Sequence, residues 1–414
     1  GGIVRGEVAT MRPSNRGAQI PSFKVMDVMR QAAAKEAALK EAGSSTRVLH
    51  LEVGQPSTGA PQKVKEAAAA AVHADKLGYT GALGTPELRS KVAAEYGKRY
   101  GVKVEADEVL MTTGSSGAFV VAFTALFDAG SRVAMATPGY PCYRNILQAL
   151  GCEIVTIPTT AESNWQPTVA MLDRAAAGGK IDGLIVASPS NPTGTVILGP
   201  EMEELCGWCT SNGVAFVSDE IYHGLTLGRR PVTALAYKGD SVVINSFSKY
   251  HCMTGWRVGW MVVRDKALHP AMEALLQNLY ISVPTLAQVA AVTALDCEEE
   301  LDGHVARYRE NLRVLLDGLP SAGFDRISRP DGAFYLYCDV TSLLRLTGAR
   351  DSLALCSLLL AECAVAITSG LDFDPERGGG YARFSFAGST ADMGEACRRL
   401  QGWYGGLGTA ESRM

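Results

Sequence analysis

The sequence has almost no excess of charge of one sign, since its 414 residues carry 39 Lys and Arg against 43 Asp and Glu, a formal net charge of −4. Without a basic excess there is no global field to bind a nucleic-acid backbone by counterion release. Long hydrophobic runs are also missing, because stretches such as Ala118–Phe127 are shorter than the ~20 apolar residues of a membrane span. No charged and apolar leader with a cleavage site opens the sequence, so we expect no signal peptide. We therefore expect neither nucleic acid nor a membrane as a partner.

Cysteine is sparse, with ten residues scattered along the chain, several of them in apolar surroundings. Cys206 and Cys209 form a C-x-x-C pair, but no second pair and no histidine pair stands at the spacing of a zinc site. Buried reduced thiols are typical of cytoplasmic proteins. The cysteine pattern therefore predicts a cytoplasmic protein without a metal site.

The composition is that of an ordinary globular protein, with 47% hydrophobic and 20% charged residues. At ~100–200 residues per domain, the length predicts two or three domains, or one large domain with a satellite. From Val109 onward, short apolar strands alternate with longer helical patterns. The predicted strands are Val109–Thr112, Arg132–Ala136, Glu153–Ile157, Gly183–Ala187, Ala215–Ser218 and Ser241–Ser246, and the predicted helices are Gly117–Phe127, Pro141–Leu150, Pro167–Ala177 and Glu201–Asn212. This alternation predicts an α/β fold with a mostly parallel sheet covered by helices on both faces.

After about residue 300 the pattern changes to that of a smaller α+β unit. The elements predicted there are strands at Phe334–Cys338, Val365–Thr368 and Ala382–Phe386 and helices at Leu301–Leu316, Leu353–Glu362 and Ala391–Tyr404. The elements predicted before the sheet are a strand at Leu49–Val53 and helices at Phe23–Ala42, Pro61–His73 and Pro86–Tyr100. We expect the first of these helices to complete the smaller unit. The predicted domains are a large one over residues 50–296 and a small one formed by residues 12–49 with 297–414.

Polar residues follow the predicted strands, which is where sheets of this kind bind ligands. After the first strand comes the small-residue turn Thr113–Gly117, which contains Ser115 and Ser116 and leads into a helix. The N-terminus of such a helix can bind an anion, although similar turns also occur without a ligand. Asn191 follows a later strand, in a turn that two prolines and a glycine make rigid.

Charged residues occupy the same position after two further strands. Asp219 directly follows a strand, with Tyr222 three positions later. A carboxylate buried there needs a cation or a hydrogen-bond donor to stay charged. Alternatively, Asp219 could cap a helix, since Asp is a favoured N-cap residue. Lys249 follows another strand and could be a Schiff-base nucleophile with a lowered pKa, or could simply reach solvent. The donors near Lys249 that suit a phosphate are Ser246, Ser248 and Arg257.

The order of these residues resembles the class I and II aminotransferases, the aspartate-aminotransferase-like enzymes of fold type I that use pyridoxal 5′-phosphate. The resemblance extends from about Phe23 to Trp403. The matching segments are Ser190–Gly194, Asp219–Tyr222, Ser246–Lys249, Gly255–Gly259 and Tyr381–Phe386. It implies a large domain with a seven-stranded, mostly parallel sheet between helices, and a smaller α+β domain made from the N- and C-terminal segments. It also implies an enzyme that moves an amino group between an L-amino acid and a 2-oxo acid.

The resemblance implies a role for each motif residue. Lys249 would hold the cofactor covalently and then act as the base that moves the substrate proton. Asp219 would keep the pyridine nitrogen protonated, and Asn191 and Tyr222 would donate hydrogen bonds to the phenolate oxygen of the ring. The residues implied around the phosphate are Ser115, Ser116, Ser246, Ser248 and Arg257.

Four further positions are implied by the same resemblance. Tyr140 corresponds to an aromatic residue that stacks on the cofactor ring. Tyr79 corresponds to a tyrosine that reaches the phosphate of the neighbouring subunit, which implies a homodimer with shared active sites. Arg383 would hold the substrate α-carboxylate as a bidentate pair, with Gly54 and Asn191 beside it.

Residues that bind a second carboxylate elsewhere in the family are missing. Leu276–Pro284 contains no arginine, and the turn Gly114–Gly117 contains no lysine. The resemblance therefore implies a neutral or aromatic amino donor rather than a strictly acidic one, unless Arg12 or Arg16 supplies the missing cation. The acceptor is expected to be a common 2-oxo acid.

Two alternatives use the same cofactor. A lyase or synthase of the same fold would share Lys249, Asp219, Tyr222 and Arg257, so these motifs leave that alternative open. A regulatory module that senses the cofactor is less well supported, because only about twenty residues precede Phe23, too few for a helix-turn-helix domain. A nicotinamide dehydrogenase is not indicated, since no G-x-G-x-x-G opens a helix.

Overall fold

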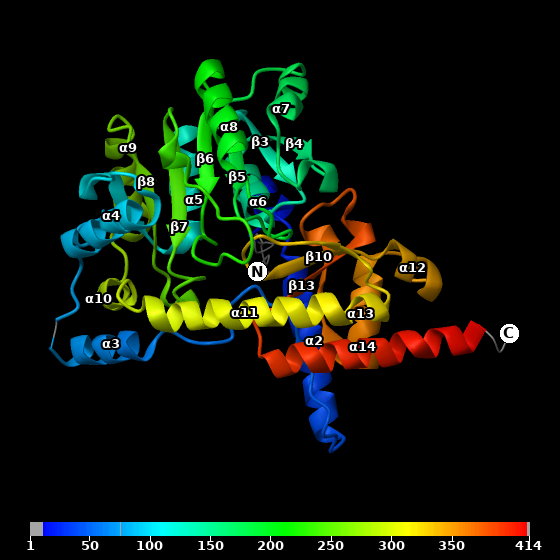
Figure 1. The fold of residues 1–414 in the computed structure, drawn as a ribbon. Helices are drawn as coiled ribbons and strands as arrows, with labels where there is room; N and C mark the ends of the chain where they lie inside the picture. The colour runs from blue at the N-terminus through cyan, green and yellow to red at the C-terminus, as the bar shows by residue number, and fades with distance from the viewer. Residues whose placement is uncertain (1–10, 75, 412–414) are drawn as a thin grey trace, which may run out of the picture.

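The computed structural model describes residues 11–74 and 76–411, and a seven-stranded sheet lies at their centre (Figure 1). In spatial order its strands are β2 (Val109–Thr112), β8 (Gly259–Val263), β7 (Ser241–Ser246), β6 (Ala215–Asp219), β5 (Gly183–Ala187), β3 (Arg132–Thr137) and β4 (Glu153–Pro158). Of these described strands, β8 alone runs in the opposite direction to the other six. The predicted α/β fold with a mostly parallel sheet is therefore confirmed.

Successive residues of each strand pack against helices on opposite faces of the sheet. Leu110 and Val242 belong to the core on one face, whereas Met111 and Val243 belong to the core on the other. The helices on the first face are α5 (Gly114–Leu126), α6 (Pro141–Leu150) and α9 (His269–Tyr280), and those on the second are α4 (Pro86–Tyr100), α7 (Val169–Ala176) and α8 (Gly199–Asn212). Because both faces are covered, the central strands consist mostly of apolar residues.

A second, antiparallel sheet is built from the C-terminal part of the described chain. In spatial order its strands are β12 (Thr368–Ser369), β13 (Tyr381–Ser385), β10 (Tyr335–Asp339) and β9 (Arg326–Ser328). The helices of this part are α11 (Glu298–Gly318), α12 (Thr341–Thr347), α13 (Ser352–Cys363) and α14 (Thr390–Glu411). In Figure 1 the long helices α11 and α14 run side by side along the lower edge of the molecule, in agreement with their packing.

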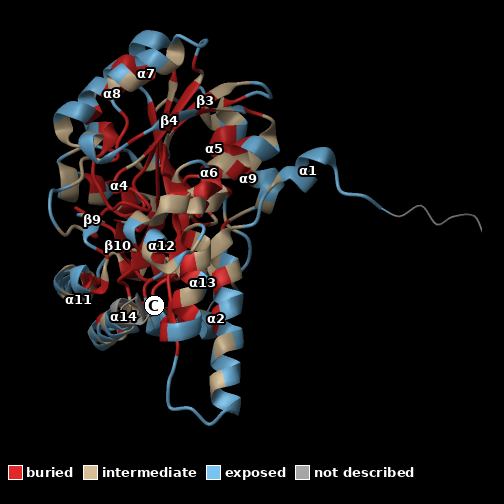
Figure 2. Cartoon of the chain, turned by 90° about the vertical axis from the view of Figure 1, so that its right-hand side faces the viewer, coloured by how far each residue is buried: buried red, intermediate tan, exposed pale blue. Residues whose placement is uncertain are grey.

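The N-terminal helix α2 (Lys24–Glu41) packs with this C-terminal part. Its Val28 and Ala32 lie in one small core with Leu360 and Ala366. The short strand β1 (Leu49–His50) pairs in parallel with β11 (Val365–Ala366). Figure 2 shows α2 beside α13, with its outer face exposed, and the exposed α1 (Asn15–Gln19) projecting from the body. Helix α2 is thus joined to the C-terminal part of the described chain by packing.

The other described elements lie between these parts. The remaining α-helices are α3 (Gln62–Ala74) and α10 (Thr285–Ala294), and the short 3-10 helices are η1 (Ala106–Glu108), η2 (Ala161–Ser163), η3 (Ala234–Ala236), η4 (Thr254–Trp256), η5 (Pro320–Ala322), η6 (Gly370–Asp372) and η7 (Gly378–Gly380). Helices α3 and α10 pack against each other, and α10 also contacts α4. Helices α3, α10 and α4 therefore form one group on the second face of the large sheet.

Some predicted bounds differ from the structure. The helix predicted from Gly117 begins at Gly114, because the first amide groups of a helix need no partner within it and small residues are tolerated there. The strand predicted over Val365–Thr368 divides into β11 and β12, since its halves pair with different strands, β1 and β13. Strand β8 and helices α9 and α10 were not predicted. The predicted bounds of α4, α6, β2, β5 and β7 are confirmed.

No single helix in the described part of the chain is long and apolar enough to cross a membrane. Helices α9 and α10 meet such a test of length and composition only as a pair, and the two are bent by 120°. All ten cysteines are buried and free, including Cys206 and Cys209 within α8. Within the described residues, no cluster of His, Cys, Asp or Glu could hold a metal ion.

Candidate active site

The carboxyl ends of the central parallel strands border a cavity of about 510 Å³. One wall of the cavity is formed by the segments after β5, β6 and β7 and by the start of α5. The other wall is formed by α2, β10 and β13. The cavity therefore lies between the two sheets. The predicted site residues that line it are Gly54, Ser115, Ser116, Tyr140, Asn191, Asp219, Tyr222, Ser248, Lys249, Arg257 and Arg383. Of the predicted set, Ser246 and Tyr79 do not line it.

Lys249 lies just beyond β7, with its amine inside the cavity. Its Nζ donates a hydrogen bond of 2.5 Å to the carbonyl oxygen of Gly54. Burial, with help from Arg383 and Arg257, lowers the pKa of Lys249 to about 8, although Asp219 opposes this shift. A buried amine with a lowered pKa is a suitable nucleophile for a carbonyl carbon.

Gly54 has no room for a side chain. A Cβ atom there would lie 2.6 Å from the hydroxyl oxygen of Tyr335. The backbone can therefore lie this close to Tyr335 only because this residue is glycine. The predicted backbone role of Gly54 near the substrate remains a prediction, and its carbonyl contact with Lys249 is an addition to it.

Asp219 is buried at the end of β6. Its Oδ1 accepts a hydrogen bond of 3.0 Å from the backbone N–H of Ile221, and its Oδ2 accepts one from the hydroxyl of Tyr143. Burial raises the pKa of Asp219 to about 6, even though these hydrogen bonds and Lys249 act to lower it. No hydrogen bond or ion pair from a cationic side chain in the described residues reaches this carboxyl group. A cationic group of a ligand would therefore be stabilised there.

Tyr143 is a site residue that the sequence reasoning missed. It lies on α6, three positions after Tyr140, and the two rings meet edge to face with centroids 5.5 Å apart. Residues three apart in a helix share a face. That spacing is the signal that could have indicated Tyr143, once Tyr140 was placed in the site.

Arg383 lies on β13 and is only 4% exposed. Its Nη1 donates to Asn191 Oδ1 at 2.9 Å, and its Nη2 donates to the carbonyl oxygen of Glu52 at 2.7 Å. Its Nε is buried without a hydrogen-bond partner, and none of the ion pairs among the described residues involves this guanidinium. A buried guanidinium without a counter-ion is suited to the carboxylate of a ligand.

Tyr335 supports both Arg383 and Tyr222. The guanidinium carbon of Arg383 lies 4.3 Å from the centroid of the Tyr335 ring, and the hydroxyl oxygens of Tyr335 and Tyr222 are 2.9 Å apart. The sequence reasoning included Tyr335 in a predicted strand region but not in the site. No local pattern indicates it, because the contact depends on the pairing of β10 with β13.

One end of the cavity is suited to an anion. Ser115 and Ser116 lie in the first turn of α5, and the guanidinium of Arg257 approaches Gly114 so closely that a Cβ atom there would lie 2.5 Å from Nη2. The amide groups of a helix N-terminus and a guanidinium both favour a phosphate. Ser246 lies behind Ser248, to whose hydroxyl it donates a hydrogen bond of 2.8 Å. The structure therefore brings the predicted phosphate residues together, with Ser246 in a supporting position.

The opposite side of the cavity is apolar, and none of its residues was predicted to belong to the site. We call Phe23, Val25, Met26, Met29 and Val53 the apolar wall. The first four belong to α2 or directly precede it, and the ring of Phe23 lies 6.0 Å from that of Tyr140. A helix with apolar residues on its inner face gives no local sign of whether it packs against protein or a ligand.

A carboxylate far along the chain holds the start of α2. The two oxygens of Asp372 accept hydrogen bonds from the backbone N–H groups of Lys24 at 3.0 Å and Val25 at 3.2 Å. Phe23, at the N-cap position, provides no side-chain cap of its own. Asp372 therefore provides the cap that the helix sequence lacks.

Two groups of predicted residues lie outside the cavity. Tyr79 is 82% exposed, in a turn that Thr285 holds by a 2.5 Å hydrogen bond from its hydroxyl to the carbonyl of Gly78. Arg12 and Arg16 do not line the cavity, whose cationic side chains among the described residues are Lys249, Arg257 and Arg383.

The chain is similar to known enzymes over nearly its whole length. The family described as aminotransferase class I and II matches residues 46–400. The valine–pyruvate aminotransferase of Mycobacterium tuberculosis is 50% identical, with 93% of this chain and 97% of that protein covered. The aspartate aminotransferase of Thermotoga maritima is 30% identical, with 94% and 98% covered.

Solved structures give the same result. A crystal structure of an aminotransferase from Mycobacterium tuberculosis has a TM-score of 0.90 and 49% identity, with 96% of this chain and 100% of that chain covered. The aspartate aminotransferase from Thermus thermophilus with maleate has a TM-score of 0.84 and 29% identity, with 95% and 99% covered. This chain belongs to the class I and II aminotransferases of fold type I, enzymes that transfer an amino group between an amino acid and a 2-oxo acid.

Proposed function

We propose that this chain is a pyridoxal 5′-phosphate-dependent aminotransferase whose amino donor is a neutral, aliphatic L-amino acid. The observation that carries the donor class is the apolar wall, together with the absence from the described cavity lining of a cation beyond Lys249, Arg257 and Arg383. A second carboxylate on the donor would meet methionine and valine side chains without a counter-charge. The 50% identity with a valine–pyruvate aminotransferase supports the same class and favours pyruvate as an acceptor.

The residues of the cavity fit pyridoxal 5′-phosphate. Lys249 offers a buried amine for the aldehyde, and Asp219 offers a buried carboxylate for a protonated ring nitrogen. Tyr140 offers an aromatic face for the ring, and Asn191 and Tyr222 are the donors for its phenolate oxygen. The residues proposed to hold the phosphate are Ser115, Ser116, Ser246, Ser248 and Arg257, with Tyr79 of a second subunit.

Bound pyridoxal 5′-phosphate supplies an electron-withdrawing ring that stabilises negative charge at the Cα atom of the amino acid. Arg383 holds the α-carboxylate of the donor and so fixes the direction of its Cα–H bond. The amine of Lys249 would accept the proton from Cα and donate it to C4′ of the cofactor, and in the second half of the transfer it would carry a proton in the reverse direction. Asp219 keeps its negative charge beside the ring nitrogen, and Tyr143 restrains the carboxylate by its hydrogen bond.

Several coarser features belong to the same proposal. We propose a large domain over residues 50–296 and a small domain from residues 12–49 with 297–414, which is supported by the packing of α2 against α13. A homodimer with shared sites is supported by the exposure of Tyr79 outside its own cavity. A reducing, cytoplasmic location is supported by ten free cysteines.

The test is a panel of amino donors assayed with pyruvate and with 2-oxoglutarate, following both the new amino acid and released ammonia. We expect valine, leucine or alanine to give the highest kcat/KM, and aspartate and glutamate to give far lower values. A preference for aspartate would contradict the donor class. Release of ammonia without a new amino acid would instead favour the lyase alternative.

A further inference from the structure

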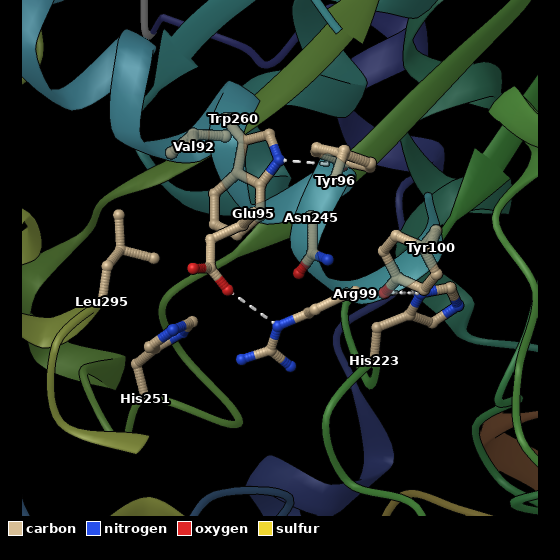
Figure 3. Close-up of a pocket in the computed structure, with 10 residues that line it drawn as sticks. All are labelled: Val92, Glu95, Tyr96, Arg99, Tyr100, His223, Asn245, His251, Trp260 and Leu295. Carbon is tan, nitrogen blue, oxygen red and sulfur yellow. Dashed lines mark hydrogen bonds and ion pairs between the residues drawn. The ribbon is translucent and has the colours of Figure 1, made fainter. Parts of the chain in front are cut away.

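A second, small cavity of about 30 Å³ lies on the α4 side of the large sheet (Figure 3). It has room for one or two water molecules. Its lining residues are Val92, Glu95, Tyr96, Arg99, Tyr100, His223, Asn245, His251, Trp260 and Leu295. Several of them belong to the same loops as the cofactor-facing residues: His223 directly follows Tyr222, and His251 lies two positions after Lys249. The loops after β6 and β7 therefore border both this cavity and the candidate active site.

His223 connects two of these loops to α4. Its Nε2 lies 2.9 Å from the carbonyl oxygen of Ser188, which begins the segment that leads to Asn191. Its Nδ1 lies 2.6 Å from the hydroxyl oxygen of Tyr100, a contact that Figure 3 marks by a dashed line between the two side chains. The segments after β5 and β6 are thus joined through one buried imidazole, which α4 holds in place.

The contacts of His223 specify one tautomer. A carbonyl oxygen can only accept, so Nε2 carries the proton and donates it to Ser188. In the neutral ring Nδ1 is then an acceptor, and the hydroxyl of Tyr100 is its donor. Burial, with a smaller contribution from Arg99, lowers the pKa of His223 to about 3 and keeps the ring neutral.

A neighbouring acid is consistent with this tautomer. Glu220 Oε2 lies 3.4 Å from Nδ1 of His223. Burial raises the pKa of Glu220 to about 8, so this carboxyl group is mostly protonated at neutral pH. A neutral carboxyl group does not favour a proton on Nδ1, and the contact is not an ion pair.

The position of the Ser188 segment decides the geometry of the substrate site. Asn191 accepts a 2.9 Å hydrogen bond from Arg383, which has no carboxylate partner of its own among the described residues. A shift of this segment therefore moves the amide at the cavity and the guanidinium that binds to it. Small displacements of positioning groups lower turnover strongly, by about 10²-fold for 1 Å.

We propose that His223, held in one neutral tautomer by Tyr100, is a positioning residue for amino transfer, acting through the Ser188–Asn191 segment on Asn191 and Arg383. The proposal rests on the proposed function for its effect on turnover. Its structural half, the hydrogen bond from His223 to the Ser188 carbonyl, does not depend on which substrate the enzyme uses.

The experiment compares His223→Phe, His223→Gln and Tyr100→Phe in the cofactor-loaded enzyme. Phenylalanine fills the space of the ring without hydrogen bonds, whereas the glutamine amide can donate to Ser188 and accept from Tyr100. We expect His223→Phe to lower kcat for the best donor by about 10²-fold and Tyr100→Phe to lower it by about tenfold, while His223→Gln restores a large part. The second measurement is hydrogen exchange of the peptide over residues 188–197, which we expect to accelerate in His223→Phe and Tyr100→Phe.

His269→Phe is the matched control. Its Nε2 also lies within hydrogen-bond distance of a backbone carbonyl, 2.8 Å from that of Val263, at the opposite end of the large sheet. We expect this variant to lose stability but to keep kcat and the exchange of residues 188–197. Unchanged exchange in both His223→Phe and Tyr100→Phe would overturn the proposal, as would an equal loss of kcat in His269→Phe or no restoration by His223→Gln. A wild-type enzyme that transfers no amino group would refute the proposed function, whereas the exchange measurement would still decide the role of His223.

Discussion

The two sides of the active-site cavity differ in burial and in chemistry. On the strand side, Asp219 is 3% exposed and Tyr222 is 5% exposed, and each has specific hydrogen-bond partners. On the α2 side, Met26 is 50% exposed and Met29 is 37% exposed, and both line the cavity with apolar side chains. Under the proposed function, the strand side would therefore carry the chemistry shared by all donors, and the α2 side would distinguish between them.

The two sides also differ in their energetic cost. Burial shifts the pKa of Asp219 up and that of Lys249 down, so keeping both buried groups charged opposes folding. Methionine on the apolar wall carries no such cost and adapts to different ligand shapes. Substitutions on the strand side should therefore abolish transfer, and substitutions on the apolar wall should redirect it.

The largest expected effect is that of Lys249→Ala. Without the amine, both the covalent link to the cofactor and the base at Cα are lost, so we expect kcat to fall by about 10⁴-fold. The measurement is borohydride fixation of the cofactor followed by mass spectrometry. Fixation at an undiminished level in this variant would exclude Lys249 as the attachment site.

Asp219→Asn should have the next largest effect. The amide cannot stabilise a positive ring nitrogen, so we expect cofactor binding to remain while kcat falls by about 10²- to 10³-fold. Single-turnover kinetics with the best donor, at saturating cofactor, measures this effect. Near-normal turnover would remove Asp219 from the mechanism.

Arg383→Ala should weaken the binding of every amino donor to a similar extent. It removes a buried guanidinium that we propose to bind the α-carboxylate, so we expect kcat/KM to fall by about 10²-fold for aliphatic and acidic donors, chiefly through KM. The same panel of amino donors measures this fall in kcat/KM. An effect confined to one donor would show that Arg383 contacts the side chain instead.

The pH dependence of cofactor attachment tests the lowered pKa of Lys249. Attachment needs the neutral amine, which forms as the pH rises toward the pKa of about 8. We therefore expect the rate of attachment to the cofactor-free enzyme to rise about tenfold between pH 6 and 7, about fivefold between pH 7 and 8, and then to level off. The rate of attachment is measured by the stopped-flow absorbance of the bound cofactor. A rise that continued unchanged to pH 10 would show an amine with an ordinary pKa.

The smallest expected effect, and the sharpest test of the difference between the two sides, is that of Met26→Arg. A cation on the apolar wall would pair with the distal carboxylate of aspartate, so we expect kcat/KM for aspartate to rise by about three- to tenfold relative to valine. Val72→Arg, at an apolar residue that is 53% exposed and outside the cavity, is the control for added surface charge. An unchanged donor ratio would mean that the side chain of the donor does not reach α2.

Most of the large sheet and the polar half of the site could be predicted from the amino-acid order. A short apolar run followed by a polar residue is a local pattern, and the ends of parallel strands meet at one edge. Asn191, Asp219 and Lys249 were predicted to come together for that reason, and they line one cavity. The divided strand at Val365–Thr368 was missed, because its partners lie far away in the chain.

The apolar half of the cavity and the supports behind the site became visible only in three dimensions. Asp372 caps a helix that begins 348 residues earlier, and Tyr143 reaches Asp219 across 76 residues. His223 links Ser188 and Tyr100 in the same manner. A hydrogen bond between residues so distant in sequence leaves no periodicity or spacing behind, because only the packing of whole elements brings its donor and acceptor together.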